Sequence, residues 1–220
     1  MTTITQEILE NPKILYRHTV DEYHQMLAHG TLEDGAPFEL LDGQVVHKIR
    51  GGAEDPITIN PQHATVVSRL ADLNPKLKPL GCYLRTQSPV SLPPWNEPEP
   101  DGAIVRGTSE DYAEQHPGAT DVLCVIEAAD ASLRRNRGYK QSIYANSAIA
   151  RYIILNLIDR VAEVYTEPMV GKGRYGQAST LTPKQTLVLP TAAGKTVHVP
   201  LKRLLGPGGG KKRRVQRPVP

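Results

Sequence analysis

The strongest hydrophobic pattern in the chain is the run Asp121-Val-Leu-Cys-Val-Ile-Glu127, in which five apolar residues follow one another between two acids. Such a run is typical of a strand that is buried on both faces of a sheet. Shorter apolar stretches predict strands at 103–105, 151–157 and 161–166, and Asp159-Arg160 joins the last two as a hairpin. The pattern therefore predicts a sheet with 121–127 in its interior.

Three stretches show helical spacing of apolar residues. The first follows a capping box at Thr19–Glu22 and can end at Gly30. The second begins near Pro61 and directs Val66, Val67, Leu70 and Leu73 inward, after a polar loop at 50–60. In the third, which runs over 132–147, Ser132 is the expected N-cap.

Turn signals divide the rest of the chain. Asp42-Gly43 predicts a tight hairpin turn between two short strands, and the proline-dense segment 93–100 must be a loop. Weaker strands are predicted at 83–86, 89–92, 187–189 and 197–201. Helices that alternate with a mixed set of strands indicate the α/β class, as an α+β mixed sheet flanked by helices behind an N-terminal helix and β-hairpin. We expect one domain over 1–205 and a disordered basic tail over 206–220.

Charge changes this picture mainly at the C-terminus. The 220 residues carry a net charge of +3, but the last twenty contain seven basic residues and no acid, so positions 1–200 carry −4. Aromatic residues make up only 5% of the chain, which argues against a stacking surface for single-stranded nucleic acid. With no apolar run of about 18 residues and no visible secretory signal, we expect a cytoplasmic protein without a membrane partner. Cys82 and Cys124 are expected to be buried, reduced thiols.

The candidate chemistry is acidic. Asp101 directly precedes one predicted strand, Glu127 ends the central strand, and Lys140 follows thirteen residues later. If the two strands are neighbours, their carboxylates converge, and two close carboxylates favour a bound cation. Hard oxygen ligands favour Mg²⁺ or Mn²⁺, which can activate water against a phosphodiester while an ammonium stabilises the developing charge. On spacing alone, scattered surface ion pairs are the commoner explanation.

An ordered set of motifs narrows this choice. The set resembles the Uma family of "putative restriction endonucleases" within the PD-(D/E)XK nuclease superfamily, from about Thr19 to Leu205. Its parts are Phe38-Glu-Leu-Leu-Asp-Gly43, His63, Glu97-Pro-Glu-Pro-Asp101, Val125-Ile-Glu127-Ala-Ala-Asp-Ala-Ser-Leu133, Lys140 and Tyr144-Ala145. The resemblance implies a restriction-endonuclease-like fold, a mixed β-sheet flanked by helices, with a metal site.

The resemblance also implies roles for individual residues. Asp101 is the first acid of the motif and Glu127 the second, and both are expected to bind the metal. Where the motif's lysine would stand two positions later, this chain has Ala129, and Lys140 in the following helix takes its place. The long lysine side chain makes this displacement physically acceptable. The backbone carbonyl of Ala128 is the natural third ligand.

Two further residues match the family less decisively. Glu39 is either a further metal or water ligand or a plain polar strand residue. His63 is a general base, a residue that orients substrate, or a structural histidine. Asn136 stands where the family often has an acid. The flanking arginines could touch phosphates, although a solvated helix turn is the plainer interpretation; they are Arg134, Arg135 and Arg137.

Two functions from different classes follow. The first is a Mg²⁺- or Mn²⁺-dependent DNA endonuclease that works as a homodimer. The alternative is a catalytically inactive nuclease-fold protein that acts as a nucleic-acid-binding or assembly module, which the acidic body favours because dedicated duplex binders usually present a basic face. The basic run at 211–214 either attracts polyanions or is a solubilising extension.

Overall fold

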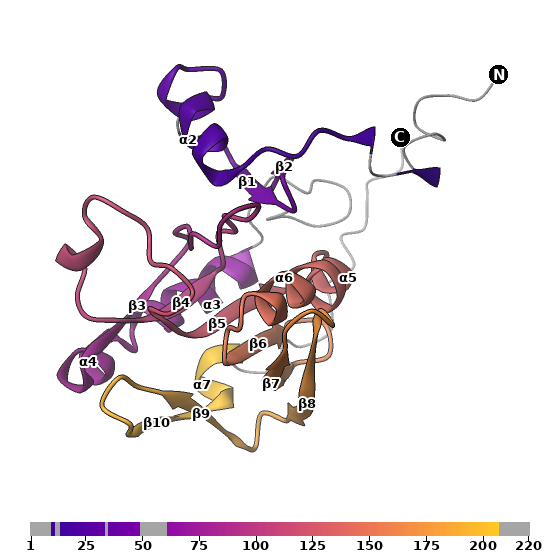
Figure 1. Ribbon diagram of the computed structural model, residues 1–220. Helices are drawn as coiled ribbons and strands as arrows, with labels where there is room; N and C mark the ends of the chain where they lie inside the picture. The colour runs from indigo at the N-terminus through magenta and orange to yellow at the C-terminus, as the bar shows by residue number, and fades with distance from the viewer. Residues whose placement is uncertain (1–9, 12–13, 34, 49–60, 207–220) are drawn as a thin grey trace, which may run out of the picture.

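In the computed structural model, the described residues are 10–11, 14–33, 35–48 and 61–206. A six-stranded sheet in the order β3-β4-β5-β6-β7-β8 forms their centre (Figure 1). β5 and β6 are parallel and every other neighbouring pair is antiparallel, so the predicted mixed sheet is confirmed. The strands are β3 (Cys82–Arg85), β4 (Gly102–Arg106), β5 (Val122–Ala129), β6 (Arg151–Asn156), β7 (Val161–Met169) and β8 (Arg174–Leu181).

β5 is the buried interior strand that its apolar run predicts. Because side chains alternate along a strand, Cys124 and Ile126 enter one core while Val125 and Ala129 enter the other. Glu127 lies on the second face, among residues that are all buried. The sequence of this strand thus places one carboxylate in the buried interior of the sheet.

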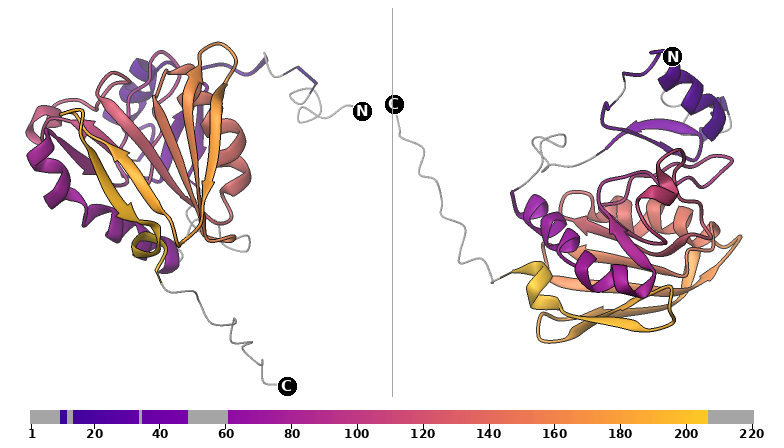
Figure 2. Two further views of the ribbon diagram at one scale, coloured as in Figure 1. Left: turned by 90° about the horizontal axis from the view of Figure 1, so that it is seen from below. Right: turned by 90° about the vertical axis from the view of Figure 1, so that its left-hand side faces the viewer.

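One face of the sheet is covered by α3 (Pro61–Ala71), α4 (Asn74–Leu77), α7 (Leu201–Leu205) and the separate hairpin of β9 (Thr186–Pro190) and β10 (Thr196–Pro200). In the left view of Figure 2 this layer lies on the opposite side of the sheet from the helix α6. Val66 and Leu70 of α3 pack with Leu187 and Leu204 in one core cluster. The predicted inward face of α3 is therefore confirmed.

The other face carries a helix of mixed geometry. α5 (Leu133–Arg135) leads into the π-helical turn η4 (Asn136–Lys140) and then α6 (Gln141–Asn146). In this turn the amide of Gln141 donates to the carbonyl of Asn136, five residues earlier. Ser132 is the N-cap of this helix, as predicted, but its side chain makes no capping hydrogen bond.

The N-terminal helix and hairpin form a small unit beside the sheet. The capping box of α2 (Val20–Ala28) is present, and β1 (Phe38–Leu41) pairs with β2 (Gln44–His47). Asp42 and Gly43 have φ values of 52° and 76°, as a tight hairpin turn requires. Leu40 pairs with Glu97, which attaches the hairpin to the proline-rich loop.

Some predicted elements differ in the structure. The strand expected at 89–92 is reduced to isolated bridges at Ser91 and Leu92, because prolines flank this segment. β8 was not predicted, since its exposed side chains leave no apolar alternation. The strand expected at 197–201 ends at Pro200, and α7 begins at Leu201.

Other expectations are met or lie beyond what the structure describes. Both cysteines are buried and free, as expected. The loop at 50–60 and residues 207–220 of the tail fall outside the described residues. None of the helices in the described part of the chain has the length and apolar character that crossing a bilayer requires.

Candidate active site

The register of β4 and β5 places Asp101 next to Glu127. Gly102 pairs with Ile126, so Asp101 comes just before the paired segment at the position next to Glu127. Both residues line a cavity of about 30 Å³, which can hold one or two water molecules. The structure thus brings together the two acids that the sequence singled out.

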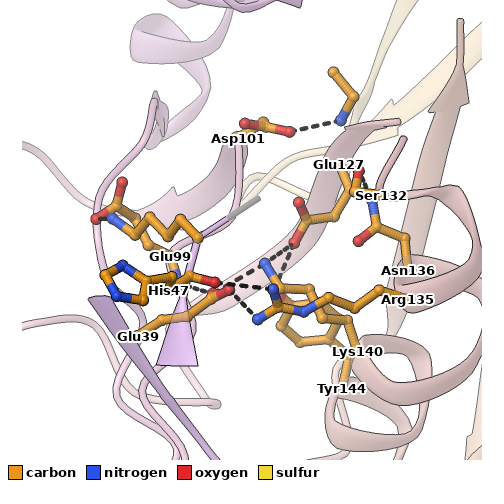
Figure 3. A network of polar contacts seen from close by, with 12 residues as sticks. Glu39, His47, Glu99, Asp101, Glu127, Ser132, Arg135, Asn136, Lys140 and Tyr144 are labelled. Atoms are coloured by element: carbon orange, nitrogen blue, oxygen red, sulfur yellow. Dashed lines mark hydrogen bonds and ion pairs between the residues drawn. The ribbon is translucent and has the colours of Figure 1, made fainter. Parts of the chain in front are cut away.

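Glu127 is buried, and its Oε1 accepts two hydrogen bonds (Figure 3). Lys140 Nζ donates to it over 2.9 Å, and the Tyr144 hydroxyl donates over 2.9 Å. Burial raises the pKa of Glu127; the ammonium of Lys140 opposes the rise, but the negative charges of Asp101 and Glu39 add to it, and the pKa reaches about 7. This carboxyl group therefore changes its protonation state near neutral pH.

Lys140 joins two carboxylates. Its Nζ lies 2.9 Å from Glu127 Oε1 and 3.0 Å from Glu39 Oε2, and its side chain is only 6% exposed. Burial lowers the pKa of Lys140, but the charges of Glu127 and Glu39 outweigh burial and raise the pKa above its ordinary value. Lys140 thus keeps its proton, and it reaches the site from the end of the π-helical turn.

Both oxygens of Glu39 are engaged by groups of the protein. Arg135 Nη2 donates to Oε1 over 2.6 Å, and the amide of Glu99 donates to Oε2, the oxygen that also contacts Lys140. Arg137 is likewise paired, with the buried Glu163. The interpretation as a solvated helix turn is therefore wrong for Arg135, whereas Arg137 is solvent-exposed while it pairs with Glu163.

Asp101 is held from two sides. Its Oδ2 accepts a hydrogen bond of 2.8 Å from the amide of Ala128, and its Oδ1 lies 2.9 Å from His63 Nε2. His63 is buried in α3. Burial lowers the pKa of His63, but the hydrogen bond to Asp101 and its charge outweigh burial, so the pKa is raised. This pair links α3 to the strand that carries the acid.

The geometry agrees with a match to a known family. The family model Uma2, described as "Putative restriction endonuclease", matches residues 20–201. The chain belongs to the Uma2 family. Its fold is similar to that in the "crystal structure of a putative nuclease belonging to DUF820 from Anabaena variabilis", with 15% identity and a TM-score of 0.61. The similarity covers 85% of this chain and 97% of that one, and at this identity it shows the fold alone. A comparison with curated proteins found no match.

Sequence reasoning missed the part that several residues play in this candidate site. Tyr144 entered only as part of a motif, yet its hydroxyl contacts Glu127. Arg135 and the ion pair between Lys48 and Glu99 also line the cavity. Glu99 stands two positions before Asp101, so in an extended segment the two side chains point to the same side, and this spacing was the one available signal.

The oxygen donors at the site suit a hard cation. Among the described residues, no group of three or more His, Cys, Asp or Glu side chains is arranged to hold a metal ion. Four acidic residues line the cavity, namely Glu39, Glu99, Asp101 and Glu127. Of these, Asp101, just before β4, lies next to Glu127 of the adjacent β5. Mg²⁺ commonly binds through one or two carboxylates and keeps several waters, whereas structural zinc sites use four nitrogen or sulfur ligands. The donor set therefore fits Mg²⁺ or Mn²⁺.

Proposed function

We propose that this Uma2-family protein is an endonuclease that hydrolyses phosphodiester bonds in DNA with Mg²⁺ or Mn²⁺. One observation carries the proposal: Asp101, just before β4, and Glu127, in the adjacent β5, line one small cavity, and the ammonium of Lys140 contacts Glu127. Carboxylates for a cation beside an ammonium for a phosphate are the parts that metal-dependent phosphodiester hydrolysis requires. Membership in the family supports this assignment.

The two acids would hold the cation, with the backbone carbonyl of Ala128 as a third oxygen ligand. When bound, the ion would polarise a phosphoryl oxygen and lower the pKa of a coordinated water. Lys140 serves as a fixed positive charge and not as a base, because its raised pKa keeps it protonated. Its ammonium stabilises negative charge that develops on the phosphate.

The two remaining candidate residues, His63 and Glu39, act through their contacts with Asp101 and Lys140. His63 holds Asp101 through the contact between the Nε2 atom of His63 and the Oδ1 atom of Asp101. We therefore assign His63 the role of a positioning residue and not that of a general base. Glu39 holds Lys140 and is itself held by Arg135. Since both oxygens of Glu39 already have partners, we propose that it positions the ammonium and does not bind the cation.

The test is a plasmid-nicking assay with Mg²⁺ that compares the wild type with Asp101→Asn and Glu127→Gln. We expect each variant to lose about a hundredfold or more of the cleavage rate. Glu163→Gln is the matched control, because Glu163 is also a buried acid paired with a cation of the same helix, but it does not line the catalytic cavity. Equal nicking by all four proteins would reveal a contaminating nuclease and would overturn the proposal.

One observation favours the alternative, a binding or assembly module without cleavage. Within the described ranges no ready cluster of three ligands exists, and Lys140 already occupies Oε1 of Glu127. Thermal melting with and without millimolar Mn²⁺ separates the two functions, because a ligand that binds the native state raises the melting temperature. A rise that the double variant Asp101→Asn/Glu127→Gln lacks supports the nuclease, and no rise in the wild type supports the binding module. The homodimer stays a prediction.

A further inference from the structure

A second hollow lies on the face of the sheet that α3, α4 and α7 cover. Its volume is about 270 Å³, against about 30 Å³ for the catalytic cavity, and the two share no lining residue. Three cationic side chains line it, those of Arg69, Lys76 and Arg203, together with one acid, Asp72. We call it the basic groove. Within positions 1–200, which carry a net charge of −4, Arg69, Lys76 and Asp72 give the groove a charge of +1, and Arg203 adds another.

The cations of the basic groove are available to a ligand. Lys76 and Arg203 are exposed, and no ion pair joins either of them to an acid in the described part of the chain. In contrast, Arg135 and Arg137 on the other face are paired with buried carboxylates. Arg69 donates through Nη1 to the carbonyl of Leu204 over 3.0 Å, which leaves other N–H groups of its guanidinium for a second partner.

The walls of the groove are fixed to each other and to the catalytic edge of the sheet. Arg160 donates to the carbonyls of Leu205 and Gly206 at the end of α7, over 3.3 and 2.6 Å. Arg160 belongs to the turn after β6, and β6 runs parallel to the strand of Glu127, so this turn and Glu127 lie toward the same end of the sheet. These hydrogen bonds therefore fix the position of the basic groove relative to the sheet.

The helix α3 connects the basic groove to the residue that contacts Asp101. His63, which contacts Asp101, and Arg69 lie six residues apart in α3, which is roughly 9 Å along the helix axis. Successive base pairs of a duplex rise by about 3.4 Å, so a step of this size spans only a few nucleotides. Along this helix, Arg69 of the groove is therefore only a few nucleotides' length from the residue that contacts Asp101.

We propose that the basic groove binds phosphate groups of the DNA backbone a few nucleotides from the cleaved bond. The inference rests on the proposed nuclease function and names a surface that would hold the polyanionic substrate. Arginine matches phosphate with paired N–H donors, and lysine supplies a compact point charge. Such contacts give affinity and register without base specificity, and they release counterions from the DNA.

The experiment measures binding of a fluorescent duplex by anisotropy over a range of KCl concentrations, with EDTA present so that no cleavage occurs. The groove variant is full-length Lys76→Gln/Arg203→Gln. Each phosphate contact contributes about 0.9 to the slope of log affinity against log salt, so we expect the slope to fall by roughly 1.8. At about 0.1 M salt the affinity should fall about tenfold or more.

The matched control is Lys172→Gln/Arg174→Gln, which removes the same charge from exposed positions at the connection of β7 and β8. This connection contacts Asn146 of α6, on the opposite face of the sheet. We expect the control to keep the wild-type slope. If the control and the groove variant lose equal slope, only net charge matters and the proposal is wrong.

A third variant replaces the four basic residues at 211–214 of the full chain by Gln. If this variant loses all salt-dependent binding while the groove variant matches the wild type, the tail and not the groove binds DNA. No salt-dependent binding by the wild type would also overturn the proposal. Because binding is measured without metal, a groove effect with no cleavage after Mg²⁺ is added would support the groove and refute the nuclease.

Discussion

Glu127 and Glu163 form a natural pair for comparison, because the fold presents them in nearly the same way. Ile154 of β6 is the register partner of both, so the two acids lie in one row across the sheet and on the same face. Each is paired with a cation of the same helical stretch, Lys140 for Glu127 and Arg137 for Glu163. Yet the pKa of Glu127 is raised to about 7 and that of Glu163 is lowered.

The neighbours of each acid explain the opposite directions. Burial raises the pKa of Glu163, but Arg137 donates two hydrogen bonds to it, over 3.0 and 2.7 Å, and Tyr165 and Asn156 each donate another. Glu127 shares its one ammonium with Glu39 and lies near Asp101. Burial of an acid is therefore a poor sign of a functional site, whereas unneutralised like charge around a buried acid is a better one.

The largest expected effect comes from exchanging each cation for a neutral side chain. Lys140→Met should lower the free energy of unfolding by about 3–5 kcal/mol, because it leaves two buried carboxylates without their shared ammonium. Arg137→Met should cost about 1 kcal/mol or less, since that side chain is 47% exposed. Urea unfolding measures both. Equal losses would mean that the two acids have equivalent surroundings, contrary to the structure.

The second largest effect should be a difference between Glu127 and Glu163 in how each makes the stability depend on pH. Between its ordinary pKa of 4.5 and about 7, Glu127 binds a proton in the native state that the unfolded chain has released, so stability falls as pH rises through this range. Glu163 has a lowered pKa, so its stabilisation is complete above 4.5 and is lost only as pH falls below it. Glu127→Gln should remove the first dependence and Glu163→Gln the second. Unfolding free energies at several pH values check this, and a Glu127→Gln variant that keeps the wild-type fall toward neutral pH would contradict it.

The smallest effect is expected from the two tyrosine hydroxyls. Tyr144→Phe should cost about 1–1.5 kcal/mol, since Glu127 then lacks one donor inside the protein, and Tyr165→Phe about 1 kcal/mol or less beside the better-satisfied Glu163. Loss of the Tyr144 hydroxyl should also raise the pKa of Glu127 further, because that bond stabilises the carboxylate. Urea unfolding across pH measures both effects. A larger loss for Tyr165→Phe would reverse the comparison.

Parts of the fold could be predicted because their signals are local. The apolar run of β5, the capping box at Thr19 and the Asp42-Gly43 turn each depend on neighbours within a few positions. β8 could not be predicted, because its place depends on hydrogen bonds to β7 and not on apolar side chains. α7 was missed since Pro200 at its N-cap gives no side-chain signal.

In the candidate site, too, the residues with a local sequence signal could be predicted and the others could not. Asp101 and Glu127 could be paired in advance because each stands at the end of a strand with a readable pattern. The contact of Arg135 with Glu39 joins residues 96 positions apart, and nothing local in either sequence indicates it. The sequence around Glu39 therefore fits both a ligand and a plain strand residue, since its partners become visible only when the hairpin is packed against the helix.

The π-helical turn at Asn136–Lys140 makes this site sensitive to insertions and deletions as well as to substitutions. A π-helical hydrogen bond joins residues five positions apart, so the turn contains one residue more than an α-helical turn would. Deleting one exposed residue, Gly138, would let the stretch close as an α-helix and would turn the residues before it by about 100° relative to α6. Tyr144 and Lys140 would keep their relation to each other, while Arg135 would rotate away from Glu39. An alignment of related chains that opens a gap here would therefore mark a reorganised site even where every acid is retained.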